Sequence, residues 1–180
     1  MVSHRRSAGS LPACAMFTAL LCVASQIQIP LPGVPVSLSL LAVHLCAMLL
    51  KTKQAVFSVL AYLLLGLCGV PVFAGFASGP AAVLGPTGGF LFSYPLCVLC
   101  TSLLIRRFGR SLGRLFLFAL VSSFLCMAFG VSWFMLITKT PLTFPSLAYW
   151  LLFIPGDVAK AALASVLAVR LFAPFRSIGI

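Results

Sequence analysis

The chain has 180 residues, of which 62% are hydrophobic and only 7% are charged, and its mean hydropathy is +1.21. Soluble domains carry about 25% charged residues, so this composition excludes a soluble globular protein and is typical of a polytopic membrane protein. Twelve Lys and Arg residues against one acid give a net charge of +11. Because the chain has no soluble basic face, we exclude nucleic-acid binding and assign the positive charge to membrane topology.

The apolar segments predict an all-α fold, a compact bundle of six transmembrane helices that forms a single domain over residues 1–180. No strand alternation stands out. A basic stretch, His4–Arg6, precedes the first apolar segment and resembles a secretory signal, but five further apolar segments favour a retained first helix. The predicted helices span residues 12–28, 36–50, 54–70, 90–106, 112–137 and 147–172.

Basic residues are distributed unevenly among the predicted loops. The loops at 29–35, 71–89 and 138–146 contain only Lys139, and Lys160 lies inside the last helix. Since basic residues are retained on the cytoplasmic side, the other ten place both termini in the cytoplasm, with an even number of spans between them. These ten are Arg5, Arg6, Lys51, Lys53, Arg106, Arg107, Arg110, Arg114, Arg170 and Arg176.

Candidate metal and catalytic groups are scarce. The seven cysteines lie mostly in apolar segments, where free Cys behaves as a small hydrophobe, so we predict no disulfide framework. Cys97 and Cys100 have CxxC spacing without a second ligand pair, so we predict no metal site and no cofactor. One Asp and two His do not supply the groups of an intramembrane enzyme, so we do not expect an enzyme. We expect His44 to be a buried polar residue with a partner.

The predicted outer loop at residues 71–89 is uncharged, apolar and rich in Gly and Pro. A solvated loop would be polar, so we expect this one to pack against protein or against a ligand. Gly88-Gly89 leads into the helix at 90–106, whose first free N–H groups are suited to an anion. A re-entrant plug that only seals the bundle is the alternative, and the two roles are compatible.

The single acid, Asp157, lies three residues before Lys160 on one face of the last predicted helix. Burying a charge costs about 2.5–3.5 kcal/mol on insertion scales, and pairing recovers part of that. We expect Pro155-Gly156 to kink or unwind the helix there, and a strip of alanines follows from Ala161. An acceptor beside a cationic donor suits a neutral ligand with both N–H and C=O, such as a cyclic urea or an amide. A structural ion pair, or Asp157 as a helix cap, is the alternative.

Four motifs together resemble the BioY family, the biotin-specific S components of energy-coupling-factor (ECF) transporters. They are IPLPGVPVSLSLLAV from Ile29, YLLLGLCGVPVFAG from Tyr62, LGPTGGFLFSY from Leu84 and PGDVAKAALA from Pro155. The resemblance implies a membrane-embedded subunit that captures biotin from the outer face of the bacterial inner (cytoplasmic) membrane. The alternatives are an S component for another vitamin, a solitary carrier that works without an ATPase, and a structural subunit.

The resemblance also implies the binding residues. Asp157 would accept an N–H of the ureido ring and Lys160 would donate to its carbonyl, although the two ends of biotin could be exchanged. Residues 72–89 would cover the ligand, and its carboxylate would meet the first turn of the helix at 90–106. Members usually read TLQ where this chain reads Ser37-Leu38-Ser39. The implied binding set is Asp157, Lys160, Ser37, Ser39, Phe73, Gly75, Phe76, Thr87, Gly88, Ser93 and Tyr94.

The resemblance further implies separate partners that couple transport to ATP hydrolysis. Ala15 and Ala19 form a small-xxx-small pair on the first helix, where S components meet the transmembrane coupling subunit. Ordinary packing within the bundle is the alternative for this pair. The chain has no GxxxxGK[ST] motif, so ATP hydrolysis would belong to other subunits.

Overall fold

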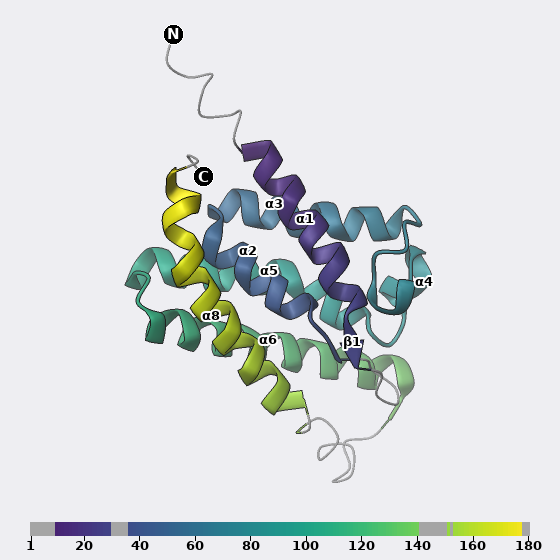
Figure 1. The fold of residues 1–180 in the computed structure, drawn as a ribbon. Coiled ribbons are helices and arrows are strands. Elements are labelled where there is room, and N and C mark those ends of the chain that lie inside the picture. The colour runs from purple at the N-terminus through teal and green to yellow at the C-terminus, as the bar shows by residue number, and fades with distance from the viewer. Residues whose placement is uncertain (1–9, 30–35, 141–150, 152, 178–180) are drawn as a thin grey trace.

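The computed structural model describes residues 10–29, 36–140, 151 and 153–177, and this part of the chain is helical, as predicted (Figure 1). Two short strands, β1 (Gln28–Ile29) and β2 (Val36–Ser37), form a two-residue antiparallel ladder. The helices are α1 (Ser10–Gln26), α2 (Ser39–Leu49), α3 (Thr52–Leu67), a 3-10 turn η1 (Ala74–Phe76), α4 (Gly79–Leu84), α5 (Gly88–Phe108), α6 (Leu112–Thr138) and α8 (Phe153–Ser177).

Several predicted boundaries need correction. The first helix ends at Gln26 and the second begins at Ser39, because Gln28 pairs with Ser37 in the ladder, which is too short to show strand alternation. The outer loop at 71–89 contains η1 and α4. The predicted start of the last helix at 147, the positions of Arg5 and Arg6, and most of the loops at 29–35 and 138–146 lie outside the described residues.

The predicted unwinding at Pro155-Gly156 is wrong, because α8 is helical from Phe153 to Ser177. A kink of the helix at this point stays a prediction. Pro155 and Gly156 both lie within this helix, close to the first residues of it that the structure describes.

The short helix α2 lies at the centre of the bundle. All of its residues except Leu41 are buried, and it contacts α1, α3, α5, α6 and α8 (Figure 1). A helix that is apolar on every side is stable only where neighbours surround it. The burial of α2 therefore explains why an 11-residue helix, too short to be ordered in isolation, is well formed here.

The one strongly polar side chain of α2 confirms the prediction for His44, which is fully buried. Its Nε2 lies 3.0 Å from the hydroxyl of Ser123, and its Nδ1 lies 3.2 Å from the hydroxyl of Ser122, both on α6. A buried polar group without a partner is costly, so these two bonds fix the register of α2 against α6.

Two long helices, α5 and α6, pack side by side with very small residues at their contact (Figure 1). A Cβ added at Gly89 would lie 2.2 Å from Cβ of Trp133, and one added at Gly130 would lie 2.2 Å from the ring of Phe90. The Trp133 indole N–H donates to the carbonyl of Gly85 at 3.0 Å. Two glycines thus set the approach of these helices at the end that carries α4.

By length and composition, two of the described helices, α5 and α6, are able to cross a bilayer. The apolar helices α1, α2 and α3 are shorter. Large apolar side chains, including Leu11, Phe124 and Leu136, are exposed on the outer surface of the bundle. A soluble protein rarely leaves so much apolar surface uncovered, which agrees with a surface that faces lipid.

We expect Gly89→Ala to lower the thermal unfolding midpoint of the purified protein in detergent. The new methyl group would overlap Cβ of Trp133, and overpacking of this kind costs about 1–3 kcal/mol. Gly113→Ala on α6 is the matched control, because nothing lies within 4 Å of its added Cβ. Equal midpoints for the two variants would contradict the assigned packing.

Candidate ligand-binding site

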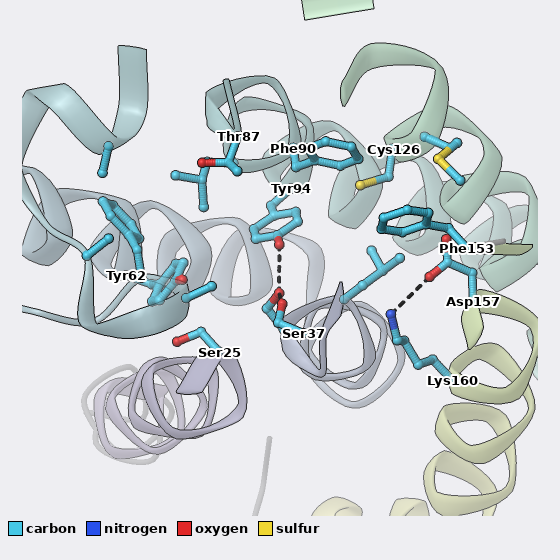
Figure 2. A pocket seen from close by; sticks show the side chains of 18 residues that line it. Ser25, Ser37, Tyr62, Thr87, Phe90, Tyr94, Cys126, Phe153, Asp157 and Lys160 are labelled. Atoms are coloured by element: carbon cyan, nitrogen blue, oxygen red, sulfur yellow. Dashed lines mark hydrogen bonds and ion pairs between the residues drawn. The ribbon is translucent and has the colours of Figure 1, made fainter. Parts of the chain in front are cut away.

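A cavity of about 100 Å³ lies between the helices and the segment that follows α3 (Figure 2). Asp157 and Lys160 on α8 lie at one end of the view, and Tyr62 on α3 and Ser25 on α1 lie at the other, with Tyr94 on α5 between them. The cavity therefore joins residues that are more than a hundred positions apart in the sequence. It is elongated, with polar groups at each end.

Seven of the eleven residues predicted for binding line this cavity. They come from β2, α2, the loop after α3, the start of α5, and α8, so the fold brings distant motifs together at one place. The seven are Ser37, Ser39, Phe73, Thr87, Tyr94, Asp157 and Lys160.

The other four predicted residues are not among those that line the cavity. Phe76 is 71% exposed, and Gly75 forms the turn before it with φ +71°. Gly88 packs so closely on the carbonyl of Val83 that a Cβ would overlap it. The Ser93 hydroxyl donates to the carbonyl of Phe90 at 2.6 Å and lies 3.0 Å from a thiol of α6, so it faces the α5–α6 contact.

Asp157 and Lys160 form an ion pair, with Lys160 Nζ donating to Asp157 Oδ1 at 3.0 Å (Figure 2). Their side chains are only 16% and 10% exposed. The predicted strip of small residues is present beside them, since Ala161 and Ala164 are fully buried and α8 packs against α2. The small side chains let α8 approach closely, and the ion pair extends from that contact into the cavity.

A chain of hydroxyl groups forms a second polar feature of the wall. The hydroxyls of Ser37 and Ser39 lie 2.5 Å apart, and the Ser39 hydroxyl lies 2.7 Å from the phenol oxygen of Tyr94. The β1–β2 ladder positions Ser37, and Ser39 begins α2 directly after it. Each hydroxyl can both donate and accept a hydrogen bond, so this row of hydroxyls can offer a ligand either a donor or an acceptor.

The remaining lining residues were not predicted. Most are apolar side chains that form the walls, and Tyr62 and Ser25 add hydroxyl groups at the end away from the ion pair (Figure 2). Of these, Leu40, Tyr62, Ala74, Phe90 and Leu91 lie inside motifs that the sequence distinguished. The eleven are Ser25, Leu40, Tyr62, Ala74, Ala77, Ala82, Phe90, Leu91, Cys126, Met127 and Phe153.

The arrangement suits a ligand with a polar head and an apolar body. The ion pair offers both a charged donor and a charged acceptor, and aromatic rings from Phe73, Phe90 and Phe153 supply apolar surface. Among the described residues, no group of three or more His, Cys, Asp or Glu is placed to hold a metal ion. The lining offers hydrogen-bonding groups and apolar surface for recognition of a ligand.

Comparisons with known proteins identify relatives over nearly the whole chain. The model of the BioY family matches residues 2–177. The biotin transporter BioY2 of Lactococcus lactis is 33% identical over 162 residues, which cover 90% of this chain and 89% of that protein. A probable biotin transporter BioY of Pyrococcus horikoshii is 35% identical over 157 residues, covering 87% and 92%. The crystal structure of an S component for biotin from an ECF-type ABC transporter superposes with a TM-score of 0.85 at 28% identity, covering 95% of this chain and 94% of that chain.

We expect Asp157→Asn to destabilise the protein more than the double substitution Asp157→Asn with Lys160→Met. The single change leaves the buried Lys160 cation without its partner, and breaking a buried pair costs about 3–5 kcal/mol, whereas replacing both charges is often nearly neutral. Thermal unfolding of both single variants and the double variant in one detergent measures this coupling. Additive losses would contradict a direct interaction.

Proposed function

Because the chain belongs to the BioY family, we propose that it binds biotin as the S component of an ECF transporter and mediates biotin uptake. One observation carries this proposal. The buried Asp157–Lys160 pair opens into a cavity whose other walls are mostly apolar. Biotin has the same division, with a polar ureido ring, an apolar sulfur-containing ring and an alkyl chain that ends in a carboxylate.

The ureido ring is assigned to the ion pair. A carboxylate accepts up to four hydrogen bonds and an ammonium group donates three, so each partner retains capacity after the bond at 3.0 Å. Asp157 accepts a ureido N–H and Lys160 donates to the ureido carbonyl. The bicyclic ring then lies against Phe90 and Phe153, which line the cavity near the pair (Figure 2).

The carboxylate of biotin is directed away from the Asp157–Lys160 pair, towards hydroxyl groups of the cavity wall. The first turn of α5 has fewer free N–H groups for a carboxylate than the sequence suggests. The N–H of Gly88 donates to the carbonyl of Gly85 at 3.0 Å, and that of Phe90 donates to the carbonyl of Thr87 at 3.2 Å. Hydroxyls of Thr87 and of the Ser37–Ser39–Tyr94 chain line the cavity instead. The exchanged orientation, with Lys160 holding the carboxylate, predicts that biotin methyl ester binds poorly, whereas the orientation proposed here tolerates the ester better.

Six spans with both termini in the cytoplasm remain our proposal for the topology. Its support is the uneven distribution of charge along α5. The N-cap of this helix, Thr87, lines the cavity, and its last turn carries Arg106 and Arg107. Arg110 follows on the same side and donates to the carbonyl of Met48 at 2.6 Å. The positive-inside rule puts this end in the cytoplasm of a bacterial cell, so the cavity lies towards the outer face.

We assign the contact with the coupling subunit to α1, and ATP hydrolysis to other chains. Ala15 and Ala19 are exposed, with large apolar residues exposed around them, so they do not pack within the described bundle. A helix face with small residues allows close approach of another membrane helix. We assign this face to the transmembrane coupling subunit and ATP hydrolysis to separate ATPase subunits.

Biotin binding to the purified protein tests the function, with thiamine and riboflavin as comparators for the alternative of another vitamin. We expect Asp157→Asn and Lys160→Met each to weaken biotin binding at least tenfold, because a hydrogen bond to a charged group contributes about 1.5–3 kcal/mol. Isothermal titration in detergent or nanodiscs measures the affinities, and size-exclusion chromatography checks that each variant remains monodisperse.

Preferential binding of thiamine or riboflavin would reject biotin as the ligand. Full biotin affinity in both variants would place the site elsewhere. Transport by the protein alone, reconstituted in vesicles without ATPase subunits, would favour a solitary carrier.

We expect Ala15→Trp and Ala19→Trp to disrupt assembly with the coupling subunits while biotin affinity stays within about twofold. A bulky side chain on a close helix contact prevents approach, and both alanines are exposed and do not line the cavity. Co-purification with tagged coupling subunits measures assembly. Ala128→Trp, at an exposed alanine of α6, is the matched control. Equal assembly of all three variants would remove α1 from the interface.

A further inference from the structure

The segment from Pro71 to Ala77 forms one wall of the cavity, through Phe73, Ala74 and Ala77. It closes on itself, because the N–H of Phe73 donates to the carbonyl of Ala77 at 3.1 Å. The Phe73 ring packs edge-on to Tyr62, with ring centroids 5.5 Å apart, and covers Gly66 so closely that a Cβ there would lie 2.0 Å from the ring. The ring of Phe73 is therefore positioned from one side by α3.

The turn in this wall has an unfavourable backbone conformation. Gly75 has φ +71° and Phe76 has φ +59°, so both are in the left-handed region. That region is accessible to glycine but costs other residues about 1–2 kcal/mol. Since Phe76 is largely exposed, its side chain does little to hold the turn. Such a conformation persists only where surrounding groups maintain it.

The side-chain amide of Gln26, the last residue of α1, supplies this support. Its Oε1 accepts the N–H of Phe76 at 3.0 Å, and its Nε2 donates to the carbonyl of Phe73 at 3.0 Å and to that of Pro71 at 3.4 Å. The neighbouring Ser25 hydroxyl donates to the carbonyl of Val72. The end of α1 thus forms hydrogen bonds with the backbone of the wall at Pro71, Val72, Phe73 and Phe76. Gln26 holds the turn through both the donor and the acceptor of its side-chain amide.

Gln26 is not among the residues that line the cavity, so its effect on a ligand must pass through the wall. We propose that Gln26 is a positioning residue that keeps the wall at 71–77 closed over bound ligand and thereby sets the residence time of biotin. This inference rests on the proposed function. A ligand behind a closed wall leaves when the wall opens, so weakening the support raises the dissociation rate constant. The association rate constant changes little, because the cavity itself is intact.

The test compares Gln26→Met with Gln54→Met. Methionine matches the length of glutamine but lacks the amide, and Gln54 is a control because its amide caps α3 by accepting the N–H of Lys51, away from the wall. We expect Gln26→Met to release radiolabelled biotin about tenfold faster, since two or three hydrogen bonds of ordinary strength are lost, with association changed less than about twofold. Gln54→Met should release biotin at the rate of the unaltered protein.

A second variant and a ligand-free measurement separate positioning from general destabilisation. Gln26→Glu keeps an acceptor for the N–H of Phe76 but loses the donor to Phe73, so its dissociation rate should lie between the other two. Hydrogen exchange of the ligand-free protein should show faster exchange at residues 73–77 in Gln26→Met and unchanged exchange in α5.

The possible failures are distinguishable. If the unaltered protein does not bind biotin, the proposed function fails and this inference fails with it. If the unaltered protein binds biotin and Gln26→Met releases it at the same rate, only the role of Gln26 is overturned. Equal acceleration in Gln26→Met and Gln54→Met would also overturn that role, because the effect would then be one of overall stability.

Discussion

A buried polar group is costly without a partner, and most such groups in the described part of this fold find one within the protein, although Gln28 Oε1 and Thr101 Oγ1 do not. That constraint places His44 against Ser122 and Ser123 and pairs Lys160 with Asp157. Each of these contacts joins α2 or the cavity to a neighbouring helix, or fixes a side chain at the cavity wall. The polar contacts are few, and for that reason each one specifies position strongly.

Close packing of helices at small residues determines the rest of the architecture. Gly89 and Gly130 let α6 lie close to α5, and Ala161 and Ala164 let α8 lie close to α2. Between lipid-facing helices, van der Waals contact replaces the hydrophobic effect as the main attraction, so close approach has direct energetic value. The cavity persists where this close packing stops, at the end of the bundle covered by the segment after α3.

Much of the fold could be predicted, because apolar periodicity and length define membrane helices well. The ion pair was predictable for a different reason. A single acid in an apolar segment is conspicuous, whereas Phe153 and Met127, which also line the cavity, look like any other apolar residues.

Side-chain direction was the part that the sequence could not supply. Ser93 and Tyr94 are adjacent on α5, yet only Tyr94 lines the cavity, because the Ser93 hydroxyl is directed to the carbonyl of Phe90 and the thiol of Cys126. The exposure of Phe76 depends on a left-handed turn that its neighbours impose, and the β1–β2 ladder is too short to leave a pattern. The hydrogen bonds from Gln26 to the wall join residues about fifty positions apart, and no local spacing in the sequence predicts them.

The helix α1 serves two surfaces, and this links them physically. Its exposed face carries Ala15 and Ala19, and its last turn holds the cavity wall through Ser25 and Gln26. A helix is stiff along its axis, so a tilt imposed by a partner on the exposed face moves the last turn as well. The wall then either follows α1 or loses the bonds that maintain the turn at Phe76. On the proposal that this wall covers the ligand, both outcomes change access to the cavity. Under the proposed assignment of this face to the coupling subunit, contact with that subunit and release of the ligand are joined through one helix.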